Sequence, residues 1–141
     1  MTDQIDTIAT RTFIAVALPQ LFVADIRAAC AFFTSKLGFS TVFTYGEPPY
    51  YAEVKRDAAR LNLRSVGRPV IDPDLRDRHE LISATLLVAT AAEIEQLAYE
   101  FKEAGVASIQ EPANKPWGAR DFIIRDIDGN LLLFSGPAEW S

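Results

Sequence analysis

The chain has little of the residues that most catalytic and metal sites require. Its 141 residues contain one cysteine, Cys30, and one histidine, His79. A single cysteine forms no internal disulfide and fits a reducing compartment, so we expect a cytoplasmic protein with Cys30 in the core. His79 lies in a charged segment typical of a solvated linker, which leaves no histidine for a Ser-His or Cys-His catalytic pair.

Long apolar runs, basic stretches and glycine-rich loops are missing as well. No run reaches the roughly 20 apolar residues of a membrane helix, and residues 1–6 lack the features of a secretion signal. The glycines are isolated and form no phosphate-binding loop. A net charge of −5 argues against a nucleic-acid partner and favours encounter with a cationic ligand. We expect neither a nucleic-acid nor a membrane partner.

What the chain does contain is an internal repeat. The offset between the two copies is 65 residues from Asp25 to Thr90, 67 from Gly38 to Gly105 and 69 from Asp57 to Asp126. Such a nearly constant offset predicts two similar modules, with a cleft between them. We expect one domain over residues 1–141, with modules at about 11–65 and 81–137 and a linker at 66–80.

Residue patterns predict the order strand-helix-strand-strand-strand in both copies, and hence an α+β fold. Asp25 and Thr90 are N-caps of amphipathic helices that end at Gly38 and Gly105. Pro19 interrupts the first strand. The expected strands are 12–22, 40–45, 50–56 and 59–65 in the first copy, and 82–88, 107–111, 120–126 and 130–135 in the second. No element is expected within 66–80.

The doubled order and two sequence segments resemble the vicinal oxygen chelate superfamily, which includes glyoxalase I, extradiol dioxygenases and bleomycin resistance proteins. The first segment runs from Val23-Ala24-Asp25 to Leu37-Gly38-Phe39, and the second is Arg125-Asp126-Ile127-Asp128-Gly129-Asn130-Leu131. Pro116-Trp117-Gly118 and Ala17-Leu18-Pro19 resemble the bleomycin resistance branch in particular. The resemblance covers about residues 11–137. It implies half-barrel sheets and a homodimer with ligand grooves at its interface.

The resemblance also implies four metal-ligand positions, which enzymes of the superfamily fill with histidine and glutamate. They fall at Leu18, at or beside Asn62, near Ser83 and at Leu133. Leucine has no lone pair to donate, so we expect no metal and no cofactor, and an enzyme is disfavoured. Glu53 and Glu80 are expected at the surface. The alternative is a glyoxalase- or dioxygenase-like enzyme with a noncanonical metal site.

Aromatic residues are the strongest candidates for binding a ligand. Trp117 is expected in a loop, where its ring could stack on a ligand, as the resemblance implies, or cover an apolar edge of the dimer. Asn62 could donate or accept a hydrogen bond at the vacated metal position. Core packing is favoured for Phe39 and Phe43. The candidate ligand-binding set is Trp117, Asn62, Tyr50, Tyr51, Tyr45 and Phe39.

These patterns favour a metal-independent small-molecule binding protein over an enzyme. By resemblance, it would sequester an aromatic or cationic compound such as bleomycin in a groove of a homodimer, with antibiotic resistance as a possible role. The polar segment before residue 11 is expected to be loose or packed on the partner subunit.

Overall fold

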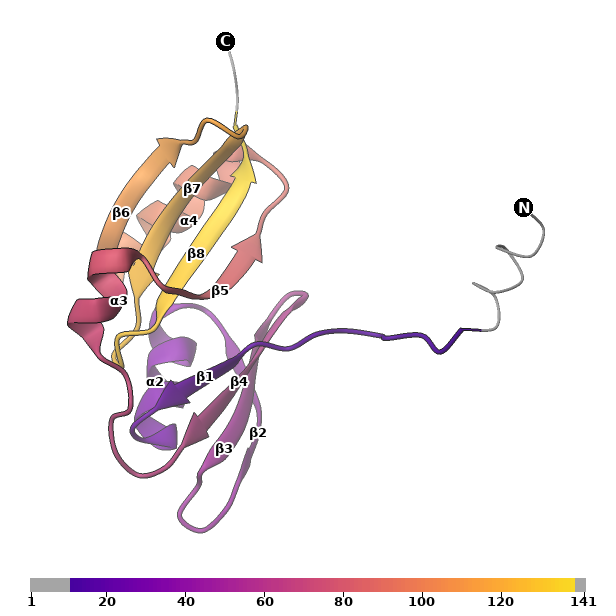
Figure 1. Cartoon of the computed structure of the whole chain (residues 1–141), viewed down its shortest axis with the longest axis vertical. Helices are drawn as coiled ribbons and strands as arrows, with labels where there is room; N and C mark the ends of the chain where they lie inside the picture. Colours follow the sequence, from indigo (N-terminus) through magenta and orange to yellow (C-terminus); the bar gives the residue numbers. More distant parts are fainter. Residues whose placement is uncertain (1–10, 139–141) are drawn as a thin grey trace.

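Two modules with the same order of elements form the protein, and α3 (Pro73–His79) links them (Figure 1). The computed structural model describes residues 11–138. The first module contains β1 (Gln20–Val23), α2 (Ile26–Lys36), β2 (Ser40–Tyr45), β3 (Tyr51–Arg56) and β4 (Ala59–Ser65). The second contains β5 (Ile82–Leu87), α4 (Ala91–Glu103), β6 (Ala107–Asn114), β7 (Ala119–Arg125) and β8 (Leu131–Pro137). The α+β fold class and the doubled order are confirmed.

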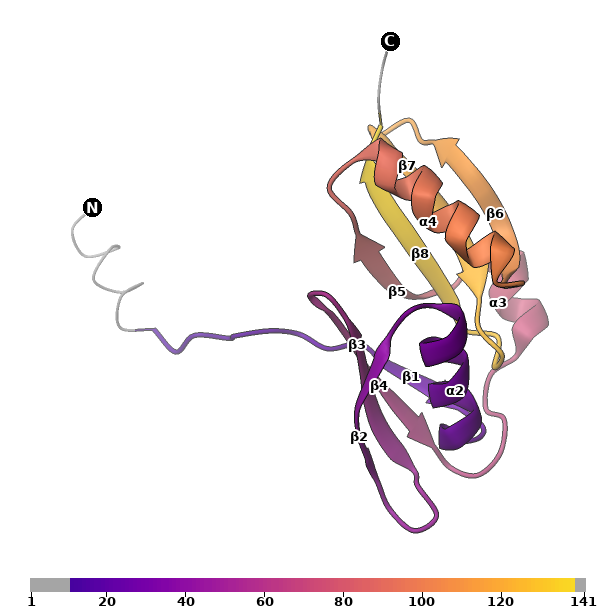
Figure 2. The same cartoon turned by 180° about the vertical axis from the view of Figure 1, so that it is seen from behind.

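Each module folds one four-stranded sheet over one helix. The strand orders are β1-β4-β3-β2 and β5-β8-β7-β6, with β1 parallel to β4 and β5 parallel to β8. The helices α2 and α4 lie on the same side of the molecule, which faces the viewer in Figure 2. The other face of each sheet, which faces the viewer in Figure 1, is called the open face.

The core lies between each sheet and its helix. Asp25 and Thr90 cap α2 and α4 as predicted, by accepting hydrogen bonds from Ala28 N and Glu93 N. The helices bury their apolar stripes, Phe33 and Phe101 among them, against alternate strand residues. Cys30 is buried, as expected. A single hydrophobic cluster includes residues of both modules, so the two halves share one core.

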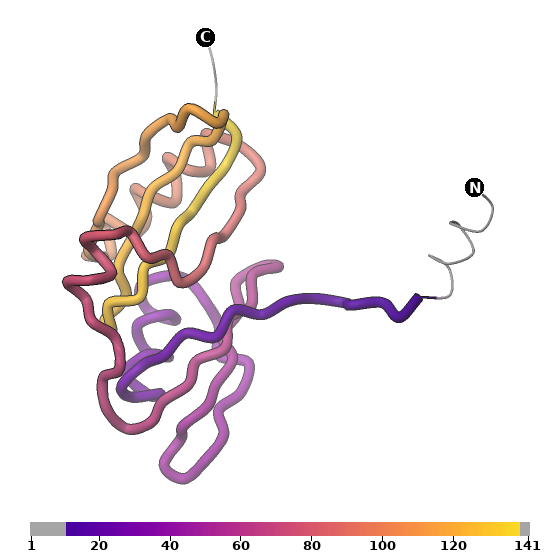
Figure 3. Tube along the Cα trace, viewed as in Figure 1, coloured from indigo at the N-terminus to yellow at the C-terminus, as the bar shows by residue number. Residues whose placement is uncertain are grey.

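The strand predicted at 12–22 is largely wrong. Only Gln20–Val23 forms a strand, and Pro19 O accepts one hydrogen bond from Asn62 N of β4, while residues 11–18 leave the body as an extended segment, called here the N-terminal arm (Figure 3). Its apolar side chains contact little: Phe13 is 86% exposed and Ile14 is 84% exposed. Apolar, β-branched composition favours a strand, but a strand also needs a neighbour, and the described residues supply none to the arm. The segment before residue 11 lies outside the described residues.

The predicted linker contains a short helix, which the sequence reasoning missed. Asp72 caps α3, Pro73 occupies its first turn and Glu80 ends it in a left-handed conformation. Asp72 followed by Pro73 is a helix-start signal, which the expectation of no element within 66–80 overlooked. His79 is exposed in the last turn, and Asp77 pairs with Arg125 of β7, which fastens α3 to the second module.

The turn between β7 and β8, residues 126–130, connects the two modules. Ala24 N donates to Asp128 Oδ1 at 2.8 Å, and Asn130 Nδ2 donates to Phe22 O at 2.9 Å. Burial raises the pKa of Asp126 to about 6, although hydrogen bonds from Asn130 and from Asp128 N oppose that rise. The turn therefore closes one junction between the modules at the end of β1.

Candidate ligand-binding site

The open face of the first sheet carries a cluster of aromatic side chains. Strand register puts Phe22, Arg64, Tyr51 and Tyr45 in one row across all four strands. The rings of Tyr45 and Tyr50 meet edge to face at 5.7 Å between centroids, and the Arg64 guanidinium lies 4.9 Å from the Tyr50 centroid. These rings form a surface on which a planar molecule can stack.

Asn62 lies in the next row, between Gln20 of β1 and Glu53 of β3. Its Oδ1 is buried and accepts no hydrogen bond from any residue the structure describes. Leaving a buried acceptor unpaired costs about 1–3 kcal/mol. A ligand that donates a hydrogen bond to Asn62 Oδ1 would recover that free energy.

The expectation that Glu53 lies at the surface is wrong, because only 5% of it is exposed. Arg60 Nε donates to its Oε2 at 2.8 Å and Arg60 Nη2 to its Oε1 at 3.1 Å. This bidentate pair satisfies the carboxylate on the open face and lowers the pKa of Glu53. With Lys55 and Arg64 on the same face, the local charge is positive although the net charge of the chain is −5.

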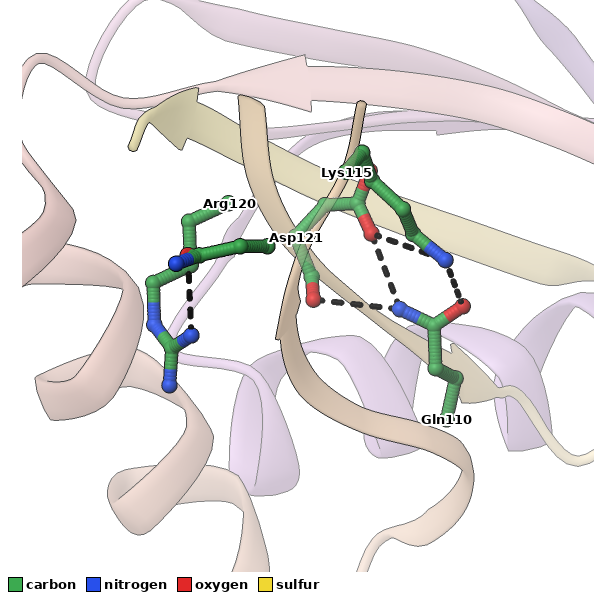
Figure 4. A network of polar contacts seen from close by, with 5 residues as sticks. Gln110, Lys115, Arg120 and Asp121 are labelled. Atoms are coloured by element: carbon green, nitrogen blue, oxygen red, sulfur yellow. Dashed lines mark hydrogen bonds and ion pairs between the residues drawn. The ribbon is translucent and has the colours of Figure 1, made fainter. Parts of the chain in front are cut away.

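The open face of the second sheet is aliphatic around a polar network. Ile123 of β7 pairs with Leu133 of β8, and one row further Asp121 is almost completely buried. Gln110 Nε2 donates to Asp121 Oδ1 at 2.9 Å, and Lys115 Nζ donates to Gln110 Oε1 at 2.9 Å (Figure 4). This closed network fixes the base of the loop between β6 and β7.

Trp117 lies in that loop, as predicted, at the tip of the hairpin. Gly118 N donates to Lys115 O, and Gly118 adopts a φ of 89°, which favours glycine at that point of the turn. The indole is 75% exposed. It therefore contributes little to the core and is accessible for contact.

The structure brings together only part of the candidate set. Tyr45, Tyr51 and Asn62 share the open face of the first sheet, and Tyr50 lies at its edge against Tyr45. Phe39 lies elsewhere: it is 5% exposed and packs edge to face on Phe33, so its predicted core role is confirmed. Trp117 lies on the second module.

Sequence reasoning also misjudged residues of the open faces. Phe43, expected in the core, is 40% exposed, because a bulge between Thr41 and Phe43 shifts the alternation in β2. Phe22 was missed, although its alternation with buried neighbours in β1 could have revealed it. Asp121 was missed too. The sequence signal that could have revealed it is a carboxylate directly before the apolar run 122–124.

The four metal-ligand positions that the resemblance implies are a poor fit for a metal. Leu18 and Leu133 have no donor atom, and Ser83 Oγ already accepts a hydrogen bond from Arg76 and donates one to Asn130. Across residues 11–138, no three His, Cys, Asp or Glu side chains come together in a possible metal site. The two leucines leave Asn62 Oδ1 and Ser83 Oγ as the donor atoms of this set, and both are neutral oxygens.

The chain belongs to the Glyoxalase/Bleomycin resistance protein/Dioxygenase superfamily, whose model matches residues 5–134. Solved structures with similar folds include the following three. A bleomycin-binding protein from Streptomyces verticillus, complexed with copper(II)-bleomycin, is 24% identical over 92% of this chain and all of its own, with a TM-score of 0.67. UcmS2 is 26% identical over 86% of this chain and 98% of its own, with a TM-score of 0.64.

A glyoxalase/bleomycin resistance protein/dioxygenase from Alicyclobacillus acidocaldarius is 16% identical over 88% of this chain and 92% of its own, with a TM-score of 0.70. Among curated proteins, none matches the chain. Within residues 11–138, no helix has the length and apolar character to cross a membrane.

Proposed function

We propose that the protein is a metal-independent binding protein that sequesters a small aromatic molecule in the cytoplasm. The single observation that carries the proposal is the buried, unpaired Asn62 Oδ1 beside an aromatic surface on the first open face. Leucine at two metal positions supports binding rather than metal-assisted chemistry. The fold is shared with proteins that bind bleomycin, which makes a drug-resistance role a reasonable extension.

The charges on the open face refine the chemistry of this ligand. The sequence left both aromatic and cationic ligands open. Arg60, Arg64 and Lys55 outnumber Glu53 on the first open face, so they favour an aromatic ligand that is neutral or anionic there. Such a ligand would also donate a hydrogen bond to Asn62 Oδ1.

Calorimetric titration with neutral and anionic aromatic compounds, and with metal-free bleomycin as the cationic comparison, tests the proposal. We expect saturable binding of at least one of them, unchanged by EDTA. Asn62→Leu preserves the approximate volume and removes the acceptor, so it should weaken binding by about tenfold, the scale of one hydrogen bond in a desolvated site. Arg68→Leu, which changes an exposed residue outside the sheets, serves as the control.

Two results would contradict the proposal. One is that Asn62→Leu leaves every affinity unchanged. The other is a stoichiometric metal in protein purified without chelator, measured by elemental analysis, together with a clear rise of Tm on metal addition. The second result would revive the enzyme with a noncanonical metal site.

We further propose a homodimer, in which the N-terminal arm packs on the partner subunit. Phe13 and Ile14 are consecutive and almost fully exposed, and adjacent exposed apolar side chains often mark protein–protein contacts. Sedimentation velocity at micromolar concentration should show a dimer for the natural sequence. Phe13→Asp/Ile14→Asp should give a monomer, whereas Thr12→Asp should not. A monomeric natural sequence would contradict this part of the proposal.

A further inference from the structure

The turn between β3 and β4 occupies the same place in the first module as the 126–130 turn in the second. Strand pairing encloses five residues in the second-module turn but only two, Asp57 and Ala58, in the first. The longer turn reaches the end of β1 and hydrogen-bonds there. The shorter turn has no residue that could do the same at the end of β5.

The end of β5 offers the same backbone groups as the end of β1. Val88 N donates to Ser135 O of β8, so Leu87 and Ala89 on either side of it direct their backbone groups toward the open edge of the sheet. At the end of β1 the corresponding groups, Phe22 O and Ala24 N, are bonded to Asn130 and Asp128. No side chain within residues 11–138 takes those roles at Leu87 O and Ala89 N.

A cavity of about 410 Å³ lies beside the end of β5, where the short β3–β4 turn leaves the junction between the modules open. Its floor is apolar and is made by Phe39, Leu86, Leu97 and Phe134. The volume falls within the range of small-molecule pockets. The β5 edge, α4 and the β3–β4 turn enclose it, so it is separate from the aromatic open face of the first sheet.

The rim of the cavity is acidic. Asp57, Glu93 and Glu100 line it together with a single cation, Arg56. Arg56 is already engaged: its Nη1 donates to Leu37 O and to Glu100 Oε2, both at 2.7 Å. The carboxylate of Asp57 and the carbonyl of Leu87 remain as acceptors above an apolar floor. Glu93 Oε1 accepts a hydrogen bond from Thr90 Oγ1 at 3.1 Å, so Glu93 offers its Oε2 as the further acceptor.

We propose that this cavity, the open junction between the modules, binds a small organic cation with an apolar body, such as an arylalkyl amine. The aryl group packs on the Phe39 and Phe134 side of the floor. The ammonium group donates hydrogen bonds to Asp57, Glu93 and Leu87 O at the rim. The site takes a ligand of different charge from the one favoured at the aromatic open face.

An NMR titration of the ¹⁵N-labelled full chain tests this site with three probes of similar size: 2-phenylethylamine, 2-phenylethanol and 3-phenylpropionate. We expect saturable shifts at the amides of Val88, Ala89 and Leu97 with the amine. The alcohol should bind about tenfold more weakly, because it lacks the charge-assisted hydrogen bonds. The carboxylate should produce no shift there, since the rim repels it.

Variants separate this site from the proposed open-face site. Ala58→Trp places a ring in the mouth of the cavity and should abolish amine binding. Glu93→Gln should weaken it three- to fivefold, about the scale of one exposed ion pair. Trp117→Ala should leave it unchanged, and the amine should still bind if no aromatic ligand is found for the open face.

Two outcomes would overturn the proposal. Equal affinity for the three probes would show that charge plays no part in the binding. Unchanged amine affinity in both Ala58→Trp and Glu93→Gln, each checked for a native spectrum, would place the amine elsewhere.

Discussion

The turns of the two modules occupy equivalent positions and differ in what they contact. In the second module Asp126 and Asn130 are almost completely buried and hydrogen-bond to each other, and Asn130 also donates to Phe22 O of the first module. In the first module Asp57 is exposed beside a cavity. Three additional residues thus convert an open junction into a closed one. The repeat gives both modules the same sheet and helix. The lengths of the β3–β4 and β7–β8 turns decide which junction between the modules is closed by hydrogen bonds.

The open faces differ in a parallel way. The first sheet presents Tyr45, Tyr51 and an unpaired Asn62, whereas the second presents aliphatic residues such as Leu133 around a network in which Asp121 is satisfied. An unpaired acceptor beside exposed rings favours binding, and a closed network favours rigidity. Under the proposed function, the first module would carry the recognition surface, and the second would supply a rigid loop that presents Trp117.

The largest effect on stability is expected from disrupting the closed junction at the 126–130 turn. Asn130→Ala removes the donor to Phe22 O and to Asp126 Oδ2 and leaves both buried acceptors short of a partner. We expect a loss of about 4 kcal/mol in the free energy of unfolding, since a buried charged group loses a hydrogen bond. Urea denaturation followed by circular dichroism measures it.

Asp57→Asn in the equivalent turn is the matched control. It keeps a residue that tolerates the positive φ of 53° at this position and should change the stability by less than about 0.5 kcal/mol. Similar losses in the two variants would contradict the contrast between a closed and an open junction.

A smaller effect is expected from the pH dependence of the closed junction. Because burial raises the pKa of Asp126 from 3.8 to about 6 in the folded chain, its stabilising contribution is complete below about pH 4 and is lost as pH rises through about 6. The difference corresponds to about 3 kcal/mol. Stability curves of the natural sequence and Asp126→Asn should therefore converge by about this amount between pH 3 and pH 7.

Carbon-13 NMR of the Asp126 carboxyl group provides a second readout, which stays informative if Asp126→Asn is too unstable to compare. A titration midpoint near 4 would show that the hydrogen bonds to Asn130 and Asp128 N outweigh burial. The pH dependence assigned to the closed junction would then be wrong.

The sequence predicted most of the scaffold and only part of the candidate site, for physical reasons. Helix caps such as Thr90 and the alternation within strands are local signals, so both long helices and seven of the eight strands were placed within a few residues. The N-terminal arm was misread because strand pairing depends on a neighbour, which composition does not reveal. Glu53 was misread because its partner Arg60 lies on the next strand, and only register brings the two charges together.

The smallest of the three effects concerns the aromatic residues at the two hairpin tips. Trp117 is exposed on the β6–β7 loop, and Tyr45 is exposed at the end of β2 in the equivalent hairpin. If both contact an aromatic ligand, Trp117→Ala should weaken its binding by about 2 kcal/mol, the scale of an interface hot spot, and Tyr45→Ala by less, because the Tyr ring is smaller. Neither should lower the free energy of unfolding by more than about 1 kcal/mol, since neither side chain is in the core.

Fluorescence titration in a Trp140→Phe background measures this, because Trp117 is then the sole tryptophan. Trp140 itself lies outside the described residues. Ligand should quench the remaining emission and raise the Tm of the natural sequence. A Trp117→Ala variant that melts far earlier yet keeps its affinity would show that the indole covers an apolar edge of the dimer. The ligand would then rest on the rings of the first module alone, and Tyr45→Ala would become the more damaging of the two changes.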